Sequence, residues 1–114
     1  MAFISDNYHS FVKTHSKVET KEQKKETLIA WHDELEVMIA HKETELMGMI
    51  KTKRLLNLKM EYYNEWGYDK ETLTTNTELQ NLNISIQELQ EELTSLEDIV
   101  GRVMKVRKAL EKEL

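Results

Sequence analysis

The 114-residue sequence contains no cysteine and no proline, and it contains only three glycines. The absence of cysteine excludes disulfides, thiolate zinc sites and thiol nucleophiles. Proline breaks helices and glycine weakens them, so their scarcity permits helix along most of the chain. β-Sheet proteins that rely on many turns need far more of these residues. We therefore expect an all-α protein.

Long hydrophobic runs and an excess of basic charge are missing as well. No apolar stretch approaches the roughly 20 residues that span a bilayer, and the first residues lack the basic and apolar regions of a signal peptide. The formal net charge is −5, whereas nucleic-acid-binding proteins usually carry a basic stripe. We therefore expect a cytoplasmic protein that contacts no membrane, and the net charge argues against nucleic acid as its partner.

The C-terminal third carries a regular apolar pattern in which spacings of three and four residues alternate. Its members are Leu79, Leu82, Ile86, Leu89, Leu93, Leu96, Val100, Val103, Leu110 and Leu114. Only Arg107 interrupts the series. This heptad pattern places one apolar seam on a long helix, and such a seam needs a second helix to cover it.

The same spacing recurs upstream, from Leu28 to Tyr63, with Lys42 and Lys53 among the apolar residues. If the chain folds back near residue 71, the two seams align in antiparallel register. The expected pairs include Tyr63 with Leu79, Leu56 with Ile86, Lys42 with Val100, Ile39 with Val103 and Leu35 with Arg107. An acidic block at 78–98 then faces basic residues at 44–64, which favours this direction. We expect Lys42, Lys53 and Arg107 to extend toward acidic neighbours at the edge of the seam.

Helix-capping signals divide the chain into segments. We expect residues 1–18 to form an N-terminal flap or short helix and residues 19–114 to form the hairpin. The expected hairpin consists of a helix at 19–66, a turn at 67–74 and a helix at 75–114. A capping box of Ser16 with Glu19, or of Thr20 with Gln23, would begin the first helix, and Gly67 would end it. A capping box of Thr75 with Glu78 would begin the second helix, and Asp69 is an earlier alternative start.

Many large apolar residues lie off the two seams. A lone hairpin would leave them in water, and monomers seldom expose large contiguous apolar patches. We therefore expect a homodimeric four-helix bundle and a protein-binding surface. The candidate residues are Tyr62, Trp66, Tyr68, Phe3, Tyr8, Phe11, Trp31, Met38, Leu55, Leu58, Ile99 and Val106.

No pattern in the sequence indicates catalysis or a cofactor. His32 and His41 each precede a glutamate by four residues, but neither the di-iron pattern nor the HExxH zinc motif is present. Neighbouring carboxylates on a solvated helix face lack the pocket that would separate their pKa values. We therefore expect no catalytic residue, no cofactor and no metal.

The expected function is protein–protein interaction by a coiled-coil adaptor, an assembly subunit or a small inhibitor of a larger protein. The protein partner itself is not identified by the sequence. The alternative is a small dimeric regulator that contacts nucleic acid through a basic end containing Lys24, Lys25 and Arg102. The composition also suits a bacterial or phage origin.

Overall fold

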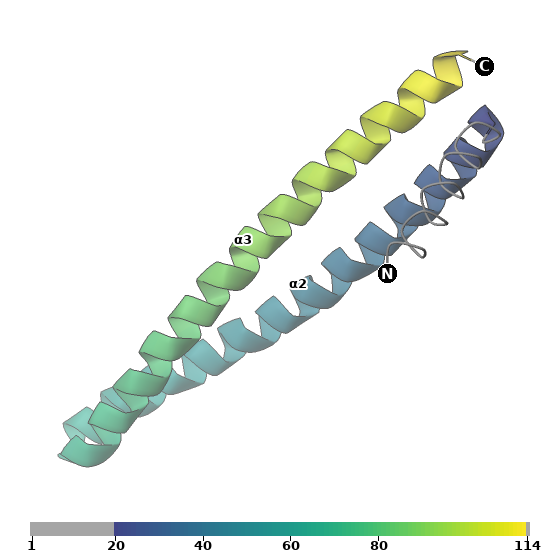
Figure 1. The fold of residues 1–114 in the computed structure, drawn as a ribbon. Helices are drawn as coiled ribbons and strands as arrows, with labels where there is room; N and C mark the ends of the chain where they lie inside the picture. The colour runs from purple at the N-terminus through teal and green to yellow at the C-terminus, as the bar shows by residue number, and fades with distance from the viewer. Residues whose placement is uncertain (1–19, 114) are drawn as a thin grey trace, which may run out of the picture.

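The computed structural model describes residues 20–113, which form two helices joined by a tight turn. Helix α2 spans Lys21–Glu65 and helix α3 spans Asp69–Glu113. Each has 45 residues and is therefore about 67 Å long at a rise of about 1.5 Å per residue. The helices lie antiparallel and side by side (Figure 1). The predicted all-α hairpin is thus confirmed, and the expected segment 1–18 lies outside the described residues.

A capping box begins α2. The Thr20 hydroxyl oxygen accepts a hydrogen bond from the Gln23 backbone N–H at 3.1 Å, and the Gln23 side chain accepts one from the Thr20 N–H at 2.8 Å. These bonds satisfy backbone donors that have no partner within the first turn of a helix. The pair is the second of the two capping boxes proposed from the sequence.

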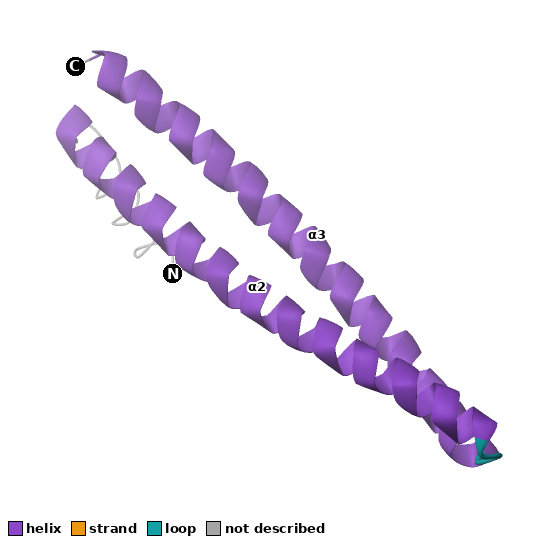
Figure 2. Ribbon diagram, turned by 180° about the vertical axis from the view of Figure 1, so that it is seen from behind, coloured by secondary structure: helices purple, strands orange, loops and turns teal. Residues whose placement is uncertain are grey.

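The turn is a Schellman motif centred on Gly67, and it is the short loop in Figure 2. Gly67 has a φ of 78°, a left-handed conformation that glycine adopts without a Cβ penalty. The Gly67 N–H donates to the Asn64 carbonyl at 3.2 Å, and the Tyr68 N–H donates to the Tyr63 carbonyl at 2.8 Å. These two bonds satisfy the final carbonyls of α2 and reverse the chain within a few residues.

Helix α3 begins at Asp69, the earlier of the two starts considered, and not at Thr75. The turn is therefore much shorter than the expected 67–74. Asp69 and Glu71 place negative charge in the first turn of the helix, where the helix dipole favours it. Residues 69–74, which were expected in the turn, are helical, and Thr72 and Thr74 donate their hydroxyls to carbonyls four residues earlier. Thr75 itself is 6% exposed and lies inside the helix.

This short turn moves the register of the hairpin by one heptad from the expected one. Lys42 was expected opposite Val100, but its ammonium lies 2.6 Å from a Glu92 carboxylate oxygen. Leu35 was expected opposite Arg107, but it packs in one cluster with Leu96 and Val103. The heptad phase of both seams is unchanged, because a shift of seven residues returns each side chain to the same face.

The core is a thin line of side chains between the helices. Within residues 20–112, the buried apolar residues are Leu35, Leu56, Leu79, Ile86, Leu89, Leu93, Leu96 and Val103. Most of them belong to α3, which therefore supplies most of the fully buried apolar side chains. No helix within the described residues combines the length and the hydropathy needed to cross a membrane.

Candidate functional site

Four aromatic side chains meet at the turn. The rings of Tyr62 and Trp66 stack, with centroids 5.5 Å apart. Tyr63 and Tyr68 each meet Trp66 edge to face, at centroid separations of 6.5 and 6.4 Å. Tyr63 and Tyr68 also contact each other at 6.3 Å, so the rings support one another. We call Tyr62, Tyr63, Trp66 and Tyr68 the turn cluster.

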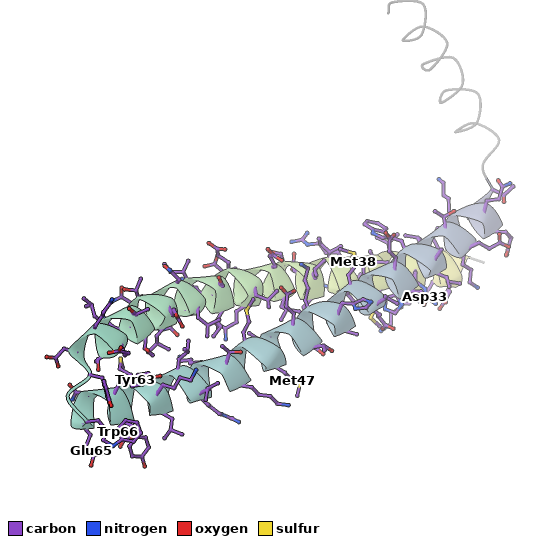
Figure 3. The ribbon with its side chains drawn as sticks, turned by 90° about the horizontal axis from the view of Figure 1, so that it is seen from below. Asp33, Met38, Met47, Tyr63, Glu65 and Trp66 are labelled. Atoms are coloured by element: carbon purple, nitrogen blue, oxygen red, sulfur yellow. The ribbon has the colours of Figure 1, made fainter. Side chains whose placement is uncertain are left out.

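Three of these four rings are open to solvent. The exposed fractions are 62% for Trp66, 54% for Tyr68 and 42% for Tyr62, whereas Tyr63 is half-buried. Figure 3 shows Trp66 at the outer end of the hairpin and Tyr63 between the two helices. Leu58, Lys59, Tyr62, Tyr63 and Trp66 line a shallow hollow of about 160 Å³. The cluster is therefore held by the fold on one side and free on the other.

A second group of predicted residues lies at the open end, where α2 begins and α3 ends. Trp31, Met38 and Val106 are exposed there, and half-buried Ile99 packs against the core cluster around Leu35. Trp31 and Trp66 are 35 positions apart, or about 52 Å along α2. The structure therefore divides the predicted surface into two separate regions.

The remaining predicted residues fall in different places. Leu55 and Leu58 are each 50% exposed and lie on α2 near the turn cluster. Phe3, Tyr8 and Phe11 lie outside the described residues. Their proposed role in partner binding stays a prediction.

Five exposed apolar residues were missing from the predicted surface: Val37, Met47, Leu73, Ile84 and Met104. Leu73 was overlooked because it was assigned to a long turn, whereas it lies in the first turns of α3 and is 68% exposed. The other four occupy positions off the seams, and their heptad positions could have revealed them. Figure 3 shows Met47 directed away from α3.

The structure defines a polar network at the open end around His32. The ring Nε2 of His32 lies 3.2 Å from Glu36, and the ring Nδ1 lies 3.4 Å from an Arg107 guanidinium nitrogen. A neutral imidazole protonated at Nε2 satisfies both contacts, since it donates to the carboxylate and accepts from the guanidinium.

Three of the groups near this network could in principle bind a metal. Ligand atoms of His32, Asp33 and Glu36 lie within 4.8 Å of one another. However, both imidazole nitrogens already have protein partners, and the Arg107 guanidinium places a positive charge beside the ring. This arrangement opposes a second cation, so the contacts are better explained as part of the hairpin interface.

Lys42 connects the two helices near their middle. The hydrogen bond that Lys42 donates to Glu92 raises the pKa of its ammonium above the ordinary value, and the negative charges of Glu92 and Glu45 act in the same direction. The side chain thus extends from the seam to acidic neighbours at its edge, as the sequence suggested. Arg107 extends to His32 instead of to a carboxylate, and its Nε atom is buried without a hydrogen-bond partner.

No match to a protein family, to a characterised protein or to a solved structure was found for the chain. Function is therefore inferred from the exposed side chains and their positions. Within the described residues, the most distinctive of these are the aromatic rings at the turn.

Proposed function

We propose that this chain is a non-enzymatic protein-interaction module, acting as an adaptor, an assembly subunit or a small inhibitor of a larger protein. The observation that supports this most is the turn cluster, where Tyr62, Trp66 and Tyr68 are 42–62% exposed. Tryptophan and tyrosine dominate binding energy at protein interfaces because they bury large areas with few rotatable bonds.

The turn cluster is suited to binding because its rings are already arranged. Ring contacts link Trp66 to each of the three tyrosines, and the Schellman hydrogen bonds hold the backbone beneath them. Immobilising a flexible side chain on binding costs about 0.5–1.5 kcal/mol. Rings that are already ordered avoid part of this cost.

The proposal includes self-association. The exposed apolar residues near both ends of α2 favour a homodimer in which two hairpins form a four-helix bundle. It also includes a cytoplasmic location and the absence of a cofactor. Binding to nucleic acid is not part of it, because the formal net charge is −5 and Arg102 of the suggested basic end lies 2.9 Å from an Asp98 carboxylate oxygen.

The test is affinity capture of partners from the native host with the full chain and with the double variant Trp66→Ala/Tyr68→Ala. We expect the wild type to enrich a specific protein and the double variant to lose at least about 90% of it, since two anchor rings are removed. Mass spectrometry identifies the captured protein, and purified components confirm direct binding.

The matched control is Ile84→Ala, which removes an exposed apolar side chain of α3 away from the turn. It should capture the partner as the wild type does, and far-UV circular dichroism should show unchanged helicity in every variant. Equal capture by the double variant would show that the turn cluster is not the binding surface.

A further inference from the structure

Helix α2 carries a second apolar line beside the seam that packs on α3. Trp31, Met38 and Trp66 are separated by multiples of seven residues, so they occupy one heptad position. Leu55 and Tyr62 share a second heptad position. Leu55 lies four residues before Lys59 and Tyr62 lies four residues before Trp66, and both Lys59 and Trp66 occupy the first position. Residues four apart on a helix are neighbours, so all five lie along one supercoiled face.

At the open end, α3 contributes to the same side of the hairpin. Ile99 and Val106 share their heptad position with Glu92, and Glu45 shares its position with Trp31 and Met38. Lys42 lies against Glu92 and is also influenced by the charge of Glu45. Because the Lys42 ammonium interacts with the carboxylates of both Glu92 and Glu45, the heptad position of Glu92 on α3 and that of Glu45 on α2 flank the same edge of the interface between the helices. Ile99 and Val106 therefore lie beside Trp31 and Met38.

This face consequently has two apolar patches with polar residues between them. The open-end patch consists of Trp31, Met38, Ile99 and Val106, and the turn patch consists of Leu55, Tyr62 and Trp66. The centre carries Glu45 and Thr52, both exposed. Within one copy, the two patches lie too far apart along the hairpin to contact each other.

The two patches are placed symmetrically about Gly48. Trp31 precedes Gly48 by 17 positions and Trp66 follows it by 18, which corresponds to about 26 and 27 Å along the helix. A Cβ atom at Gly48 would meet nothing within 4 Å, so the backbone there is open to close approach. A two-fold axis at Gly48 would bring each patch onto the other patch of a second copy.

We propose that two copies of this chain pack face to face and antiparallel, with the two-fold axis at Gly48 and with the turn patch of each on the open-end patch of the other. A two-fold dimer of this kind does not extend to further copies, because both patches of each chain are covered by the other chain. The four helices supercoil around a common axis, so heptad positions define the shared face along the whole length.

One pair of opposite charges across the proposed interface supports a second copy as the occupant. Lys59, at the edge of the hollow near the turn, comes within about one helical turn of Glu34 in the other copy. If the two turn patches packed on each other instead, the two open-end patches would remain exposed to water, and the opposite pairing would expose the turn patches. In this dimer the second copy covers Tyr62 and Trp66, so direct contact with a different protein falls to Tyr68 and Leu73, which lie beyond the shared face. This inference rests on the proposed function in treating exposed apolar side chains as an interface.

The absence of cysteine permits a direct test, because one introduced cysteine is the only thiol of the chain. With a short bismaleimide reagent, Gly48→Cys should cross-link to itself across the two-fold axis. Lys59→Cys should not, since its two copies would be about 33 Å apart along the bundle. An equimolar mixture of Lys59→Cys and Met38→Cys should give a cross-linked heterodimer. Self-cross-linking of Lys59→Cys, or failure of Gly48→Cys to cross-link, would overturn the arrangement.

Sedimentation equilibrium provides an independent measurement. The wild type should have the mass of two chains, and Trp31→Ser should raise the dissociation constant of the dimer at least about 30-fold, the effect of losing an anchor residue. Ile84→Ser, which changes an exposed α3 residue elsewhere, should leave the constant unchanged. A wild type that stays a single chain at 100 µM while its partner capture still depends on Trp66 and Tyr68 would refute the dimer and leave the proposed function standing.

Discussion

Helices α2 and α3 have equal lengths but use their apolar residues differently. Helix α3 places leucines, isoleucine and valine along one seam, and it supplies most of the buried side chains. Helix α2 contributes only Leu35 and Leu56 to that buried set within the described residues, and its seam includes His32, Lys42 and Lys53. Many of its large apolar side chains are instead exposed. The comparison indicates that α3 stabilises the hairpin, whereas α2 both completes it and presents a surface.

The largest expected effect comes from truncating a buried residue of α3. Leu96→Ala should lower the free energy of unfolding by about 2–5 kcal/mol, because it leaves a cavity beside Leu35 and Val103. Leu58→Ala, an equal truncation at an exposed α2 site, should change it by less than about 0.5 kcal/mol. Urea titrations followed by circular dichroism, at one protein concentration, measure both. Equal losses in the two variants would abolish the distinction between the helices.

A smaller effect is expected at the turn that sets which residues of the helices meet. Gly67→Ala forces a Cβ into a conformation with a φ of 78° and should destabilise the protein by about 1–2 kcal/mol. Gly101→Ala is the control, since its Cβ would meet nothing within 4 Å in a regular helix. It should stabilise the protein by up to about 1 kcal/mol. Thermal unfolding compares the two, and an unaffected Gly67→Ala would show that the turn does not constrain the register.

The smallest effect is expected for the charge that α2 places in its seam. Lys42→Met removes the ion pair with Glu92 and should lower the melting temperature slightly at neutral pH. The ion pair raises the pKa of Lys42 in the folded state, so its contribution is present below the unfolded pKa of about 10.4 and is lost as pH rises through the folded value.

Melting curves from pH 7 to 11 should therefore show the wild type and Lys42→Met converging at the alkaline end. Lys51→Met, at an exposed position of α2, is the matched control and should track the wild type throughout. A difference that grows with pH would contradict the assigned role of Lys42.

Much of the hairpin was predictable because its elements are local. The capping box of Thr20 and the left-handed position of Gly67 depend on residues within a few positions of each other. The Thr20 box was one of the two proposed, and Gly67 was predicted correctly. The seam of α3 was predictable for the same reason, since heptad spacing reports one helix face. The register was not, because heptad patterns match equally well after a shift of seven residues. The choice depended on whether residues 69–74 were turn or helix.

The candidate surface was predictable to a similar extent. Positions off the seams identified Trp31, Met38, Tyr62 and Trp66 as exposed, since a two-helix body covers only one face of each helix. The mutual contacts of the turn cluster required the turn geometry, which brings Tyr68 back against Tyr63 and Trp66. Leu73 was overlooked as a consequence of the same error that misplaced the start of α3.

The sequence by itself determined that this chain is helical, that it folds back on itself as an antiparallel hairpin, and which face of each helix is buried, because these properties follow from local propensity and periodicity. Only the tertiary structure decided which heptads meet, why Lys42 reaches Glu92, and how the aromatic rings gather at the turn. Periodic seams leave several registers nearly equal in energy. A three-residue turn with one left-handed glycine selects among them.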